Sequence, residues 1–179
     1  MSNAGVGETA PEQGGTAQWR ADVIQDFARS ELFERTFQEG MELVEETAAY
    51  LDGAGRQDSK LLSRNAALAY ASESMRLTTR LMQVASWLLV QRAVREGDMA
   101  PAAACEDRYR LNEDPAQADG ETARSELPGG LVRLADRAER LYERVRHLDQ
   151  RMYVEGAAAP EPVNPVLSHL DRLKTAFGS

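Results

Sequence analysis

Apolar residues between Arg56 and Gly97 recur at the alternating three- and four-residue spacing of an α-helix. One stripe places large apolar residues seven positions apart with small or polar residues between them: Leu61, Leu68, Met75, Met82 and Leu89, alternating with Asn65, Ser72, Thr79, Ser86 and Ala93. A second stripe follows another side of the helix: Tyr70, Leu77, Leu81, Val84 and Leu88. A helix with two apolar stripes needs neighbours on two sides. The pattern therefore predicts the central helix of a bundle, roughly 38 residues long, with Asp58 or Ser59 as its N-cap and a left-handed Gly97 at its end.

Two more amphipathic helices flank the central one. The first is predicted to begin at Ser30, and its inward stripe is Phe33, Phe37, Gly40, Val44, Thr47 or Ala48, and Leu51. A glycine inside a helix costs about 1 kcal/mol relative to alanine, so Gly40 indicates the close approach of a neighbouring helix. The third has the stripe Leu131, Leu134, Ala138, Leu141, Val145, Leu148 and Met152. The predicted fold is all-α: an antiparallel three-helix bundle with a long central helix and flexible N- and C-terminal tails.

The remaining segments set the expected domain organisation. Residues 1–26 are predicted to be a flexible N-terminal segment, residues 27–155 the bundle, and residues 156–179 a Pro-rich linker with a C-terminal tail. Inside the bundle, residues 98–126 form an acidic loop, in which Pro101 begins a short helix. Beyond the prolines, which end the third helix, apolar residues return at helical spacing: Val166, Leu167, Leu170, Leu173 and Phe177. This tail either docks on its own bundle or binds another protein.

Charge narrows the classes of partner. The net charge is −8, which argues against general binding to nucleic-acid phosphates and to anionic membrane surfaces. The charge is also uneven, because residues 30–55 carry seven acids and one base, whereas residues 56–97 carry seven bases and three acids. No apolar run approaches the length of a membrane span, and the start of the chain does not resemble a secretory signal. A cytoplasmic protein is expected, with no membrane and no direct nucleic-acid partner.

Candidate chemistry is sparse. The two histidines, His147 and His169, are far apart, and Cys105 is the single cysteine. The acidic cluster around Glu45 lacks the Glu-x-x-His elements of di-metal bundles. We therefore expect no catalytic residues, no metal and no cofactor.

One constellation on the central helix suggests partner binding. Glu73, Arg76, Arg80 and Trp87 follow one face, either as ordinary helix pairing or as a docking patch for an acidic partner. On the second hypothesis, reversing Arg76 and Arg80 to glutamate weakens binding and leaves the fold intact. Apolar surface around Tyr70, Leu77 and Trp87 also predicts a homodimer, since exposed patches usually mark association.

Two stretches, Leu43–Arg56 and Tyr70–Val94, resemble the RcdA family, regulators of CtrA degradation in alphaproteobacteria; the run from Glu73 to Trp87 is the most specific. The resemblance implies a dimeric, non-enzymatic adaptor of the ClpXP protease. Such adaptors work with CpdR and PopA type regulators, deliver substrate proteins such as CtrA at the cell pole, and have a flexible C-terminal tail. The alternatives are a structural helical oligomer or scaffold without a protease-delivery role, and a bundle that binds a small molecule.

Overall fold

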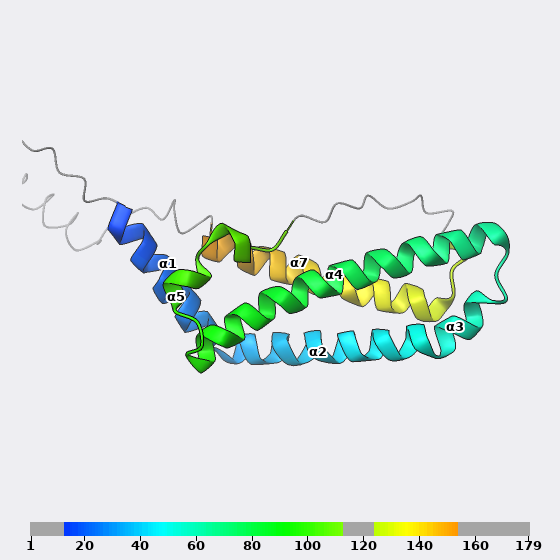
Figure 1. Cartoon of the computed structure of the whole chain (residues 1–179), viewed down its shortest axis with the longest axis horizontal. Coiled ribbons are helices and arrows are strands. Elements are labelled where there is room, and N and C mark those ends of the chain that lie inside the picture. The colour runs from blue at the N-terminus through cyan, green and yellow to red at the C-terminus, as the bar shows by residue number, and fades with distance from the viewer. Residues whose placement is uncertain (1–12, 113–123, 154–179) are drawn as a thin grey trace, which may run out of the picture.

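The computed structural model describes residues 13–112 and 124–153, and this part of the chain is all-α without a strand (Figure 1). Three long helices pack side by side: α2 (Glu31–Asp52), α4 (Arg64–Glu96) and α7 (Gly129–Tyr153). At one end lie α1 (Gln13–Ala28), α5 (Pro101–Ala104) and the 3₁₀ turn η1 (Asp107–Tyr109), and α3 (Ala54–Ser59) lies at the other. The predicted helical bundle is confirmed. The start of the short helix at Pro101 is also as predicted.

The helix directions differ from the expected antiparallel arrangement in one respect. Helix α2 runs antiparallel to both long neighbours, but α4 and α7 run parallel to each other (Figure 1). Their contacts advance together along both helices, since Arg80 stacks on Tyr142 and Trp87 bonds to Asp149. Short loops produce antiparallel neighbours, whereas the connection from Gly97 to Pro128 is long enough for the chain to return along the whole bundle before α7 begins.

Helix α2 begins and packs as its sequence predicts. Ser30 is the N-cap, and its hydroxyl accepts a hydrogen bond of 3.1 Å from the Phe33 amide. Gly40 lies where α4 crosses α2, and a Cβ on this glycine would stand 2.7 Å from Leu88 Cδ1. The predicted close approach of a neighbouring helix is therefore confirmed.

The central helix begins later than predicted. The expected N-cap at Asp58 or Ser59 is wrong, because α3 ends at Ser59 and the chain turns before α4 starts. Ser63 has the extended backbone of an N-cap and accepts from the Ala66 amide at 3.2 Å, while Asp58 accepts a 3.3 Å hydrogen bond from the Tyr50 hydroxyl. The helix ends as predicted, at Gly97 with a left-handed φ of 83°.

Helix α1 occupies part of the segment that was expected to be flexible up to residue 26. Ile24 and Ala28 are fully buried against the bundle. The Phe27 ring lies 5.7 Å, between centroids, from both Phe33 and Trp87. Helix α1 begins at Gln13, but its buried residues begin at Ala21, which is 8% exposed, so these apolar contacts move the start of the packed bundle to about Ala21. The C-terminal tail, from residue 154 onward, lies outside the described residues.

Candidate partner-binding surface

The residues predicted to form a docking patch on α4 face the bundle instead. Glu73 and Arg76 form an ion pair whose side chains are only 11% and 16% exposed. Arg80 is 8% exposed, and its guanidinium lies 5.7 Å from the centre of the Tyr142 ring. Trp87 is 2% exposed. In this conformation these four residues pack between helices and do not present a charged surface to a partner.

The apolar surface that was predicted to mediate a homodimer is also not formed by the predicted residues. Leu77 and Trp87 are core residues, at 1% and 2% exposure, and Tyr70 is half-buried against the same core. The apolar residues that α4 does expose belong to the other stripe: Leu68, Met75, Met82 and Leu89, which are between 52% and 72% exposed. Helical periodicity identified both stripes and predicted that both would be covered, but only the stripe that contains Leu77 faces the core.

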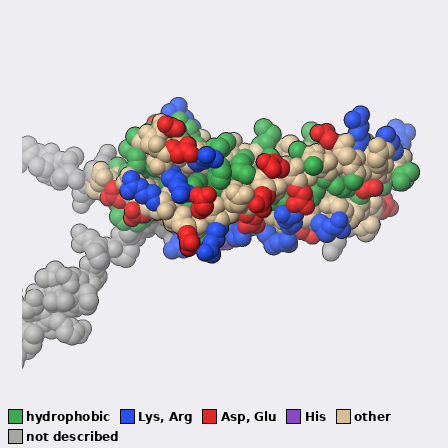
Figure 2. Space-filling model, turned by 90° about the horizontal axis from the view of Figure 1, so that it is seen from below, with side chains coloured by type: hydrophobic (Ala, Val, Ile, Leu, Met, Phe, Trp, Pro, Cys, Tyr) green, Lys and Arg blue, Asp and Glu red, His purple; other side chains and the backbone are tan. Residues whose placement is uncertain are grey.

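We call the exposed side of α4 the outer face. Every exposed residue of α4 between Arg64 and Arg92 is uncharged: Asn65, Leu68, Ala71, Ser72, Met75, Thr78, Thr79, Met82, Ser86 and Leu89. Large side chains alternate with small ones along about 36 Å of helix, at 1.5 Å per residue. By contrast, acidic and basic side chains are interspersed over the side seen from below, where α2 lies (Figures 1 and 2). An uncharged strip of this length is typical of a surface that another helix covers.

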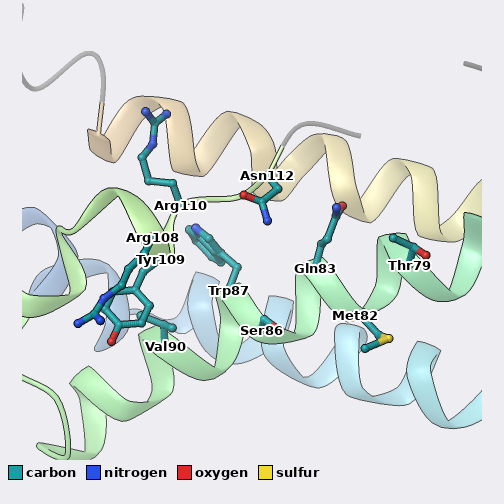
Figure 3. Close-up of a pocket in the computed structure, with 10 residues that line it drawn as sticks. All are labelled: Thr79, Met82, Gln83, Ser86, Trp87, Val90, Arg108, Tyr109, Arg110 and Asn112. Carbon is teal, nitrogen blue, oxygen red and sulfur yellow. The ribbon is translucent and has the colours of Figure 1, made fainter. Parts of the chain in front are cut away.

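A groove of about 380 Å³ opens beside one end of the outer face (Figure 3). Its floor includes Met82 and Val90 of α4, and its opposite wall is the segment from Arg108 to Asn112. The polar lining is incompletely bonded within the described structure, since Gln83 Oε1 and Arg110 Nε are enclosed without a hydrogen-bond partner there. A buried polar atom without a partner is uncommon, but both atoms are enclosed, so an occupant of the groove would reach them only if these side chains moved.

Buried side chains of α7 hold that wall in place. Asp149 is 2% exposed and accepts hydrogen bonds from the Trp87 indole at 3.0 Å, the Leu111 amide at 3.2 Å and the Arg110 guanidinium at 3.3 Å. The Tyr142 hydroxyl donates to the Asn112 carbonyl at 2.7 Å. Asp149 and Tyr142 were not among the predicted site residues, because a charged or phenolic side chain next to a heptad stripe normally faces solvent.

A third anchor lies at the end of α7. The Tyr153 hydroxyl donates a 2.6 Å hydrogen bond to the Ala104 carbonyl of α5, and burial raises the pKa of this phenol well above its usual range. The Arg110 guanidinium lies 5.5 Å from the centre of the Tyr153 ring. The last described turn of α7 is thus in contact with a residue of the groove.

The described residues hold little that could support catalysis. No group of three or more histidine, cysteine, aspartate or glutamate side chains is placed to hold a metal ion in these parts of the chain. Burial raises the pKa of the half-buried Cys105 thiol, an effect that Arg20 opposes, so its reactive thiolate is disfavoured. None of the described helices combines the length and the apolar character that crossing a lipid bilayer requires. The predicted tail residues, Val166, Leu167, Leu170, Leu173 and Phe177, lie outside the described residues.

Comparison with known proteins gives one family model and one informative structure. Residues 24–177 match a family described as a protein of unknown function, DUF1465. The chain finds no match among curated proteins. The crystal structure of RcdA from Caulobacter crescentus CB15 aligns at 73% sequence identity, covers 73% of this chain and 98% of that chain, and gives a TM-score of 0.60. At this identity and coverage, the chain belongs to the RcdA family.

Proposed function

We propose that the protein is a non-enzymatic adaptor that promotes ClpXP proteolysis of cell-cycle proteins such as the response regulator CtrA. Membership of the RcdA family supports a regulatory role in degradation. CpdR and PopA type regulators and the substrate proteins are its partners under this proposal, and the cell pole is its site of action. The role needs a surface that binds other proteins.

The outer face of α4 is the observation that carries the proposal. It is long, uncharged and apolar at regular spacing, and helices recognise other helices through such strips. Fully burying an exposed Met or Leu side chain contributes about 1.5–3 kcal/mol, and these side chains, which are already partly buried, would each contribute less. A few such residues suffice for a reversible contact, and reversibility is what an adaptor that repeatedly loads and releases partners requires.

Reconstitution tests the adaptor role. ClpXP, a CpdR-type regulator and purified CtrA are mixed with and without the full chain, and the half-life of CtrA is followed on gels. We expect the chain to shorten the half-life, and we expect a variant with Met75→Glu and Met82→Glu to lose the effect. Leu32→Glu, which changes an apolar residue 53% exposed on α2, is the matched control and should retain it. An unchanged CtrA half-life would favour the alternative, a structural oligomer or scaffold.

We further propose that the protein is a homodimer whose interface is the outer face of α4, so that a second copy and an adaptor partner compete for the same strip. The seven-residue repeat of large residues, separated by small ones, is the pattern by which two helices interlock side chains. A two-fold pairing brings the same strip from each copy together. Because both strips are uncharged, this pairing buries no unpaired charge.

Analytical ultracentrifugation tests the dimer independently of any protease. We expect the unmodified chain and Leu32→Glu to sediment at twice the monomer mass, and the Met75→Glu, Met82→Glu variant to sediment as a monomer. Circular dichroism should show the same helix content in all three, since the changed side chains are exposed. A dimer that survives both glutamates places the interface elsewhere, and a concentration-independent monomer for the unmodified chain excludes it.

The four residues of α4 that were first predicted to bind a partner have an indirect role under this proposal. Glu73, Arg76, Arg80 and Trp87 support the outer face from within the bundle, and direct contact with a partner would need them to become exposed. The tail residues 166–177 remain a proposed partner-binding segment. Removing residues 160–179 should leave the unfolding midpoint of the bundle nearly unchanged and impair CtrA delivery.

A further inference from the structure

The groove beside the outer face has the properties of a site for a short apolar segment. It is lined by Met82, Val90 and the edge of Trp87 on one side and by Tyr109 on the other (Figure 3). Met82 is 65% exposed, so apolar surface is available to an occupant. At about 380 Å³, the groove is at the small end of the range that encloses whole ligands. That volume suits a few side chains presented by a helix.

The end of α7 lies close to this groove. Tyr153, the last residue of α7, is in contact with Arg110, and Arg110 is also a lining residue. In Figure 1 the end of α7 lies at the same end of the bundle as α5, and α4 starts at the opposite end. Tyr153 therefore lies at the end of the bundle that holds the groove.

The sequence that follows contains one segment with matching chemistry. Val166, Leu170, Leu173 and Phe177 are spaced by four, three and four residues, which places them on one narrow side of a helix. Ser168 and Asp171 would lie away from this side of the helix, so the apolar side alone would enter the groove.

We propose that residues 166–177 dock as a short helix in this groove of the same copy. The twelve residues between Tyr153 and Val166 span about 19 Å as a flexible chain and about 37 Å if extended by their prolines. Tyr153 contacts Arg110 of the groove lining, so a linker of either length can bring residues 166–177 to the groove. The linker thus permits docking without strain.

Because residues 166–177 are attached to the bundle through the linker, even a weak contact with the groove would be occupied for much of the time. A helix of about twelve residues is marginal in water by itself, so its docking as a separate peptide would be weak. A short flexible linker raises the effective concentration of an attached segment to the millimolar range. A contact with a dissociation constant near 1 mM would then be occupied about half of the time.

Docking of the tail affects the outer face, because both use Met82. This consequence rests on the proposed dimer: a docked tail and a second copy compete at one end of the strip. The tail itself would dock whether or not the chain is an adaptor, so the test below needs no protease and its failure leaves the adaptor proposal intact.

Engineered disulfides test the docking in the full chain. In a Cys105→Ser background, Met82→Cys is combined with Leu170→Cys, and the matched control combines Leu61→Cys with Leu170→Cys. Leu61 is 87% exposed and lies just before α4, at the opposite end of the bundle. Under mild oxidation at low protein concentration, we expect the first pair to form an intrachain disulfide about tenfold faster than the control, as measured by non-reducing electrophoresis and mass spectrometry.

A further variant separates apolar docking from simple proximity. Leu173→Asp with Phe177→Asp, added to the first pair, should slow the disulfide to the rate of the control. Equal rates for the two cysteine pairs would overturn the proposal, and so would a product that is mainly interchain, since that would assign the groove to a second copy. A rate unaffected by the two aspartates would also overturn it.

Discussion

Arg80 shows how the burial of one residue changes the expected effect of a mutation. As an exposed residue of a docking patch, it would tolerate charge reversal. It is instead 8% exposed against the Tyr142 ring, and a glutamate there would place an ill-matched charge among packed helices.

We therefore predict that Arg80→Glu destabilises the bundle by roughly 3 kcal/mol. Arg92→Glu is the control on the same helix, because its side chain is 48% exposed, and it should change stability by less than about 1 kcal/mol. Urea unfolding followed by circular dichroism measures both. Equal effects of the two variants would show that Arg80 is not held as described.

Tyr153 predicts an alkaline limit to stability. Because burial raises its pKa in the folded state above the usual value of about 10, the folded protein favours the neutral phenol. The contribution of the neutral Tyr153 phenol to the free energy of unfolding is fully present below the pKa of tyrosine in the unfolded chain. It is lost as the pH rises toward the higher pKa of Tyr153 in the folded protein.

Tyr153→Phe should cost about 1 kcal/mol at neutral pH through the lost hydrogen bond to Ala104. It should also lose less stability than the unmodified chain between about pH 9 and pH 11. Urea midpoints across that range measure the slope. Burial also raises the pKa of Tyr50 and Tyr70, so some slope will remain in the variant, but an unchanged slope would contradict the assignment to Tyr153.

Among the helices, the crossing of α2 and α4 depends on the absence of a side chain at Gly40. A Cβ at Gly40 would stand 2.7 Å from Leu88 Cδ1, and Leu88 is itself fully buried. Although alanine normally stabilises a helix by about 1 kcal/mol relative to glycine, Gly40→Ala should destabilise the protein by about 1–3 kcal/mol through overpacking.

Gly15 of α1 provides the control, because a Cβ there would meet nothing within 4 Å. Gly15→Ala should be neutral or stabilising in the same thermal unfolding experiment. Leu88→Ala will itself cost stability, but if the two side chains clash, the double variant should lose less than the sum of the two single losses. Strictly additive losses would exclude the clash.

The elements themselves were largely predictable, and the reasons for the errors are physical. Ser30, Gly40 and Gly97 act locally, through a cap, a close approach and a left-handed turn, so sequence alone identifies them. The direction of α7 depends on how a long connection runs, and no local pattern records that. Periodicity found both stripes of α4, but which stripe faces the core depends on the side from which α2 and α7 approach.

The candidate surface was less predictable than the fold. The sequence indicated that α4 needs partners on two sides, and the residues of the outer face, first assigned to the interior, are exposed in the structure. Asp149 could not have been found, because its three donors come from α4 and from the segment after η1, which are distant in sequence. Charge patterning alone could not distinguish an exposed Arg76–Arg80 pair from a buried one.

For the molecule as a whole, the composition of the outer face has a chemical consequence. Met75 and Met82 are its central large residues and are 72% and 65% exposed. Exposed thioethers are oxidised to sulfoxides, which are polar and disrupt apolar interfaces. If the outer face mediates association, mild peroxide should dissociate the dimer, and methionine sulfoxide reductase should restore it. A variant with Met75→Leu and Met82→Leu should remain dimeric under the same peroxide treatment, as measured by size-exclusion chromatography with light scattering.

Association through this strip would therefore respond to oxidative stress through the oxidation of these two methionines.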